Sequence, residues 1–213
     1  MQLGDIVTRM SNGTVQRQDK NEVGLPVTRI ETISNGTINL KKVGYLNHYS
    51  PETIEKFRLK YNDVLFSHIN SDSHIGKTAI FKLDCLLIHG MNLLLIRPNT
   101  AIIDPDFLTY VFRSYRFSGK FLSIAQHAVN QSSINQSKLR TLPIPLPPLN
   151  EQKRIVAKVE ALVAESKTAL TTLDKIPFLI RECRQSILNR HSKVNLHHES
   201  QSMNPYKSYL KDY

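Results

Sequence analysis

Short stretches in which apolar and polar residues alternate fill the first two thirds of the chain. Two of them, VTRIETI (27–33) and TINLKKV (37–43), flank Ser34-Asn35-Gly36. An Asn-Gly pair readily adopts the positive φ angles of a tight turn, so these residues predict a β-hairpin. Further strands are predicted for the apolar runs at 62–69, 77–81 and 91–97.

Two segments carry residues that are typical of a helix N-terminus. Ser50-Pro51-Glu52 offers a capping hydroxyl, a proline suited to the first turn and an acidic side chain near the positive end of the helix dipole. Asp104-Pro105-Asp106 repeats the pattern, and apolar residues follow it at the spacing of an amphipathic helix. Because strands and helices come in no repeating order, residues 1–149 predict one domain of the α+β class, a mixed α/β fold.

The pattern changes abruptly at TLPIPLPPLN (141–150), where four prolines in ten residues favour an extended backbone. Asn150 is then expected to cap a new helix, with Glu151 in its first turn. From there the apolar residues alternate spacings of four and three, which is the pattern of a coiled-coil seam. The seam comprises Ile155, Val159, Leu162, Ser166, Ala169, Leu173, Ile176, Ile180, Cys183 and Ile187.

The long helix, residues 150–190, is too long for its own domain to cover. Its seam from Ile155 to Ile187 covers 33 residues, which at ~1.5 Å per residue span about 50 Å, so we expect the seam to pair with another helix. Packing against the chain's own domain is the alternative. Pro177 removes a hydrogen bond in the middle, so a kink or break is expected there. Residues 191–213 show little periodicity and are expected to be mostly disordered.

Composition excludes several classes of protein. The chain has 213 residues, a net charge of +10 and 40% hydrophobic residues, which suffices for a core and argues against wholesale disorder. Its most apolar stretch, 85–96, is interrupted by polar residues well short of the roughly 20 that a membrane span needs. Asp5 and Arg9 stand where a signal peptide would be apolar. With only Cys85 and Cys183, the expected compartment is the reducing cytoplasm.

No catalytic or metal-binding pattern is complete. Gly76-Lys77-Thr78 ends like a phosphate-binding loop, but the glycine-rich segment that such a loop needs is missing. Pro105-Asp106 could form a nuclease pattern with Glu165 and Lys167, yet metal-assisted hydrolysis needs carboxylates that converge, and these are expected to lie far apart. The eight histidines show no ligand spacing. We therefore expect no catalytic residues, no metal and no cofactor.

Two polar loops, 67–77 and 128–138, carry side chains suited to DNA. Asn and Gln can bind adenine through two hydrogen bonds, while Ser, Lys and Arg can bind phosphates or base edges. The same residue types also stabilise turns and cap helices, so the loops alone decide nothing. The candidate contacts are Arg29, Lys41 and Lys42 on the predicted hairpin, His68, Asn70, Ser71, Ser73, His74 and Lys77 in the first loop, and Asn130, Gln131, Ser132 and Asn135 in the second.

The segment 128–162, AVNQSSINQSKLRTLPIPLPPLNEQKRIVAKVEAL, strongly resembles a junction found in specificity subunits of type I restriction-modification systems. In that family a target-recognition domain ends there and enters a long helix, and residues 144–155 are the most specific part of the resemblance. Further similarity lies at 3–14, 27–38, 62–81 and 181–188.

The resemblance implies a non-catalytic protein that recognises double-stranded DNA. A full subunit of the family has two target-recognition domains and two long helices, whereas this chain has one of each, at 1–149 and 150–190. It therefore resembles a half-subunit that pairs with a second half-subunit, as a homodimer or with a different chain. The pair would form an antiparallel coiled coil through Ile155, Val159, Leu162, Ala169, Leu173, Ile176, Ile180 and Ile187.

In such an assembly each half-subunit is expected to read one half of a bipartite target. The long helices would dock methyltransferase subunits and, through them, the restriction subunit. The alternative is a coiled-coil assembly or regulatory half-subunit that binds the methyltransferase without reading DNA itself.

Overall fold

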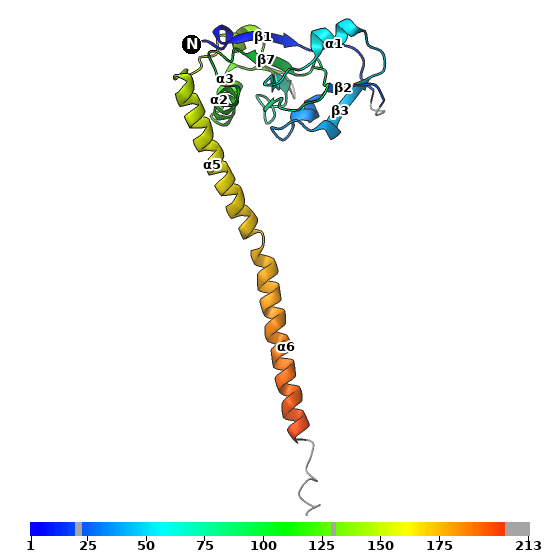
Figure 1. Cartoon of the computed structure of the whole chain (residues 1–213), viewed down its shortest axis with the longest axis vertical. Coiled ribbons are helices and arrows are strands. Elements are labelled where there is room, and N and C mark those ends of the chain that lie inside the picture. The colour runs from blue at the N-terminus through cyan, green and yellow to red at the C-terminus, as the bar shows by residue number, and fades with distance from the viewer. Residues whose placement is uncertain (20–22, 129–130, 203–213) are drawn as a thin grey trace, which may run out of the picture. The chain divides into compact units, whose positions relative to one another are not determined.

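The computed structural model describes residues 1–19, 23–128 and 131–202 (Figure 1). The chain forms two compact units, the first of residues 1–158 and the second beginning at Val159. The first unit contains small sheets and short helices, and the second, as far as Ser202, is helical with one break at residues 174–175. The expectation of a mixed fold that ends in a long helix is confirmed.

The largest sheet is antiparallel, with the strand order β1-β7-β4-β6. Its strands are β1 (Val7–Asn12), β7 (Leu94–Pro98), β4 (Val64–Phe66) and β6 (Thr78–Ile80). In the central strands β4 and β7 the apolar run is continuous because both faces are covered. Phe66 and Leu94 enter one hydrophobic cluster, whereas Leu65 and Leu95 enter another on the opposite face.

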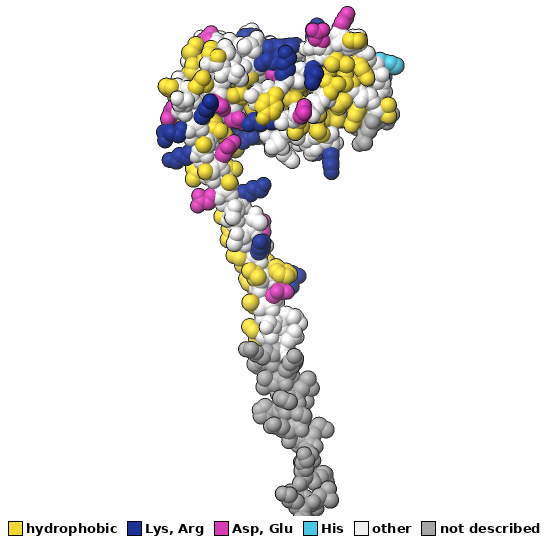
Figure 2. All heavy atoms as spheres, in the orientation of Figure 1, with side chains coloured by type: hydrophobic (Ala, Val, Ile, Leu, Met, Phe, Trp, Pro, Cys, Tyr) yellow, Lys and Arg dark blue, Asp and Glu magenta, His cyan; other side chains and the backbone are white. Residues whose placement is uncertain are grey.

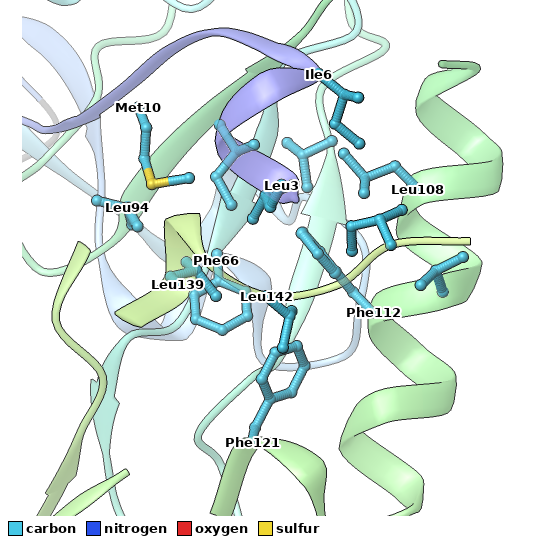
Figure 3. Packing of buried hydrophobic residues seen from close by; sticks show 14 of the residues in the cluster. Leu3, Ile6, Met10, Phe66, Leu94, Leu108, Phe112, Phe121, Leu139 and Leu142 are labelled. Atoms are coloured by element: carbon cyan, nitrogen blue, oxygen red, sulfur yellow. The ribbon is translucent and has the colours of Figure 1, made fainter. Parts of the chain in front are cut away.

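The main core forms where α2 (Pro105–Phe117) and α3 (Lys120–Ile124) pack against this sheet (Figure 3). Phe66, Phe112 and Phe121 meet edge to face, with ring centroids 5.0 to 5.9 Å apart. The short helix η1 (Leu3–Asp5) adds Leu3 to the same cluster. As the sequence predicts, Asp104 caps α2 and accepts hydrogen bonds from the amides of Asp106 and Phe107.

The predicted hairpin of 27–33 and 37–43 is wrong in its position. The paired strands are β2 (Leu25–Thr28) and β3 (Val43–Leu46), and the residues between them form the short helices η2 (Ile30–Ile33) and η3 (Leu40–Lys42). Thr32 is buried, and its hydroxyl donates to the Lys42 carbonyl and accepts from the Arg29 amide at 2.8 Å. These local bonds replace the expected strand ladder.

Among the remaining short elements, the cap predicted at Ser50 is confirmed, but short strands also form where the sequence pattern predicts only polar loops. Ser50 caps α1 (Pro51–Phe57) by accepting from the amide of Thr53. The strands β5 (Ile69–Asn70), β8 (Gln126–Ala128) and β9 (Gln131–Ser133) and the helix α4 (Gln136–Arg140) complete the domain. None of the helices in the described ranges is long and apolar enough to cross a bilayer.

The C-terminal part consists of α5 (Leu149–Leu173) and α6 (Ile176–Ser202). The Pro148 carbonyl accepts from the amides of Glu151 and Gln152, so Asn150 lies within the first turn and is not the predicted cap. The helix breaks just before Pro177, as expected, because a proline fits the first turn of a new helix. The backbone of α6 is helical to Ser202, where we expected disorder, and residues 203–213 lie outside the described part.

Gln152 joins the first turn of α5 to the domain. Its side chain is fully buried, and Oε1 accepts from the amide of Asp104 at 2.8 Å. Its Nε2 donates to the carbonyls of Ile102 at 3.1 Å and Pro147 at 2.8 Å. One side chain therefore links the start of α5, the capping residue of α2 and the proline-rich connection.

His89 is buried and neutral. Its Nε2 lies 3.0 Å from the carbonyl oxygen of Leu93, and Nδ1 has no partner among the described residues. Burial is the main cause that lowers the pKa of His89 to about 4; the bond to Leu93 partly opposes it, and the nearby charge of Arg9 adds to it. The folded protein therefore resists protonation at this position.

We predict that Gln152→Leu lowers the free energy of unfolding by about 3 kcal/mol, because one buried amide and two carbonyls lose their partners. Urea titration followed by circular dichroism measures this. Lys153→Leu is the matched control, since Lys153 is the exposed neighbour on the same helix. Equal stability of the two variants would contradict the role of Gln152.

We also predict that the chain loses stability as pH falls from about 6.5 to about 4. In this window the unfolded state binds a proton at His89 and the folded state does not, so the loss reaches about 3 kcal/mol for this group. His89→Gln keeps a donor for the Leu93 carbonyl and should flatten the pH dependence of the urea midpoint. A variant with the same pH slope as the wild type would show that His89 is not responsible.

Candidate nucleic-acid interface

The two polar loops form one surface through a small sheet. Its strand order is β5-β9-β8, and β5 pairs with β9 so that Ile69 lies opposite Ser133 and Asn70 opposite Ser132. Because β5 belongs to the first loop and β9 to the second, this pairing joins segments that are far apart in the sequence. The candidate contacts near this pairing in the first and second loops are therefore neighbours in space.

The first loop is closed at its base. The Ser67 amide donates to the Lys77 carbonyl, and the Gly76 amide donates to the Ser67 carbonyl, both at 2.8 Å. Gly76 has a φ of +74°, and a Cβ atom there would lie 2.4 Å from the Phe121 ring. Only glycine fits this position, and it seats the base of the loop on the aromatic core.

The tip of this loop is exposed. Residues 71–74 all face solvent, and the hydroxyls of Ser71 and Ser73 lie 3.3 and 2.7 Å from Nδ1 of His74. Arg116 donates to the Ser73 carbonyl at 2.7 Å and so holds the tip from the side of α2. Three side chains with donors and acceptors are thus presented together.

A polar network around the buried Ser132 ties the loops together, and its other two members are exposed. Ser132 donates to Oδ1 of Asp72 and lies 2.8 Å from Nδ1 of His127, which in turn lies 3.5 Å from Asp72. These are the residue types of a hydrolytic triad, but such a triad uses opposite ring nitrogens of the histidine for the serine and the carboxylate. Here both partners face Nδ1, so the network serves to connect loops. In the sequence, Asp72 and His127 stand out only as polar residues, so their contact with Ser132 could not be predicted.

The structure places the remaining candidates in different environments. His68 and Ser132 are buried, and burial lowers the pKa of His68, so neither side chain lies on the exposed surface. Asn135 is exposed but caps α4, because it accepts from the Lys138 amide at 2.8 Å. Asn70 is half-buried and donates to the Ser67 hydroxyl at 3.1 Å.

The other candidates divide by exposure. Lys41, Lys42 and Gln131 are exposed, although the two lysines lie in η3 and not on a hairpin strand. Arg29 is half-buried and lies 3.8 Å from Glu31, and the half-buried Lys77 donates to a backbone carbonyl. Asn130 lies outside the described residues.

The seam of the long helix is largely uncovered. Ile155 packs against the domain core and Val159 is half-buried, so the first turns of α5 use the seam internally. From Leu162 onward the seam is open in the described residues, with Leu162 54% and Leu173 58% exposed. Figure 2 shows hydrophobic side chains following the helix on one side. The exposed seam residues are Leu162, Ala169, Leu173, Ile176, Ile180 and Ile187.

Several proteins with assigned names are similar to this chain in sequence. Residues 1–177 match the family described as the type I restriction modification DNA specificity domain. The chain is 44% identical to the putative type I restriction enzyme MjaX specificity subunit of Methanocaldococcus jannaschii over 89% of this chain and 44% of that subunit. It is 24% identical to the type I restriction enzyme EcoKI specificity subunit of Escherichia coli, over 94% and 43% respectively.

Solved structures show the same fold. A chain from a study of complex assembly and conformational transition of the type I R-M system matches with a TM-score of 0.64 and 20% identity, over 89% of this chain and 44% of that one. The HsdS subunit from Thermoanaerobacter tengcongensis matches with a TM-score of 0.54 and 22% identity, over 79% and 38%. The chain thus spans less than half the length of all these relatives.

The fold and surface define a mixed α/β domain with an exposed polar loop surface, followed by a long helix with an open apolar seam. The match over residues 1–177 gives this architecture its family: the chain belongs to the specificity subunits of type I restriction-modification systems. The resemblance drawn from residues 128–162 is therefore confirmed.

Proposed function

We propose that residues 1–149 read one half of a bipartite sequence in double-stranded DNA, and that residues 150–190 pair with a second half-subunit. The observation that carries this proposal is the pairing of β5 with β9. It joins two polar loops into one surface on a chain of the specificity family. A rigid sheet under the loops supports sequence reading, because base contacts require side chains in fixed positions.

The contacts that we propose for bases are the exposed side chains at the loop tips: Ser71, Ser73, His74 and Gln131. The exposed Lys41 and Lys42 would bind phosphates, which position a protein on the duplex without reading its sequence. Asn70 and Asn135 hold a neighbouring side chain and a backbone amide, so their contribution would be mainly to the shape of the surface.

The open seam supports pairing through the long helix. Apolar residues at a/d spacing along a solvent-facing helix leave apolar surface in water, and pairing with another helix removes it at a gain in free energy. Two chains paired in antiparallel fashion would present two recognition domains related by a two-fold axis. Identical chains would then read an interrupted palindrome, since the symmetry of a dimer is matched by that of its site.

The paired helices would dock methyltransferase subunits and, through them, the restriction subunit, in the cytoplasm where the DNA lies. A second candidate function is assembly without DNA reading. It is favoured by the number of candidate contacts that are engaged in internal hydrogen bonds, such as Asn70 and Asn135.

Methylome sequencing tests the function. Cells without another type I system would express this chain with its methyltransferase subunits, and we expect one new methylated sequence with two separated parts. The triple variant Ser73→Ala, His74→Ala, Gln131→Ala should abolish or change that sequence while the complex still assembles. Assembly without a methylated sequence for the wild-type chain would instead support the second candidate function.

We predict that Leu173→Asp weakens pairing of the long helix by at least about 100-fold in Kd, because a carboxylate would be buried at the interface. Light scattering over a concentration series measures this. Thr171→Asp is the matched control, since Thr171 is exposed two residues away on the side opposite the seam. Equal molar masses for the wild-type chain and both variants would contradict pairing through this seam.

A further inference from the structure

A cleft of about 580 Å³ lies beside the first recognition loop. Its lining comes from three elements: residues 34–37 after η2, Lys77 at the base of the loop, and Arg113, Arg116 and Phe117 on α2. None of the candidate contacts apart from Lys77 lies in this lining. The sequence pattern predicts the apolar face of α2, which packs into the core, but it does not indicate that Arg113 and Arg116 line a cleft.

The three cations of the cleft are held only by neutral groups. Lys77 donates to the Ser34 carbonyl at 2.9 Å, Arg113 to the Gly36 carbonyl at 3.1 Å, and Arg116 to the Ser73 carbonyl at 2.7 Å. The lining contains no Asp or Glu, and no ion pair to any of the three forms within the described ranges. Three half-buried positive charges therefore share one cleft without a counter-charge.

This arrangement is electrostatically unfavourable as it stands. Burial lowers the pKa of Lys77, and the charge of Arg116 lowers it further. A carbonyl satisfies one N–H group but does not neutralise a guanidinium, and each arginine has further donors beyond the bond that it makes. A bound anion with several acceptor oxygens would relieve the repulsion and use these donors.

An exposed aromatic ring narrows the class of anion. Phe117 is 82% exposed, the most of any large hydrophobic side chain in the described residues, and its ring centroid lies 5.8 Å from the Arg116 guanidinium. An aromatic ring beside an arginine suits a ligand that combines phosphate with an apolar group, as the sugar-phosphate backbone of DNA does. The bond from Arg116 to Ser73 connects this cleft to the tip of the recognition loop.

We propose that Lys77, Arg113 and Arg116 bind a backbone phosphate of the DNA, with Phe117 against the adjoining nucleotide. The cleft thereby sets the register of the recognition loop on the duplex and supplies affinity that is independent of sequence. This inference rests on the proposed function, because it assumes that the neighbouring loop reads DNA.

The test measures how the affinity of the full chain for a labelled duplex carrying its methylated sequence depends on salt. Arg113→Gln combined with Arg116→Gln should weaken binding at least tenfold at about 50 mM salt and reduce the slope of log K against log salt by about 1 for each phosphate lost. Lys153→Gln combined with Lys158→Gln removes the same number of charges from exposed positions on α5 and should leave the slope unchanged.

Replacement of both arginines by lysine separates binding from folding. Lysines keep the charge but not the planar fork, so we expect the slope to be retained while the affinity falls only a few fold. The slope of log K against log salt could instead fall in the lysine variant as much as in the glutamine variant, together with a lower Tm. That result would show that the arginines only anchor the loops through carbonyls, and it would overturn the inference.

Two further outcomes bear on the same inference. A wild-type slope in the glutamine variant, while the wild-type chain still prefers its sequence, would overturn the cleft and leave the proposed function intact. Absence of any sequence preference in the wild-type chain would overturn both. Inorganic phosphate distinguishes a site for a free anion: micromolar binding that a duplex does not displace would also overturn the inference.

Discussion

One buried side-chain amide attaches the first turn of α5 to the domain. Gln152 satisfies an amide and two carbonyls that have been removed from water, and none of these groups could be left unpaired without a large cost in free energy. Because one of its partners is the amide of Asp104, the start of α5 is attached at the residue that caps α2. The first turns of α5 therefore belong to the compact unit that ends at Lys158.

The rest of the domain supports the loops from below. Strand β4 contributes to both hydrophobic clusters, and the chain leaves it directly into the first polar loop. Phe121 fills the space beside Gly76, so the base of that loop has no freedom to shift. The polar surface is thus built on the hydrophobic core, and a functional surface on a packed scaffold keeps its side chains in place.

Local signals predicted local structure well. The caps at Ser50 and Asp104 and the break before Pro177 depend on a few neighbouring residues, and all three could be predicted from the sequence. The hairpin was misplaced because the bonds and burial of Thr32 outweighed strand propensity. The pairing of β5 with β9 depends on very short strands far apart in the sequence, so no pattern could reveal it. Burial of Ser132 follows from that pairing.

The closed base of the first loop also bears on how this protein can change over time. The backbone hydrogen bonds that close the loop lie at Ser67 and Gly76, whereas residues 71–74 are exposed. Substitutions at the tip can therefore accumulate without unfolding the domain. Exchange of a few residues at the tip would then alter the polar surface, while the scaffold beneath it stays unchanged.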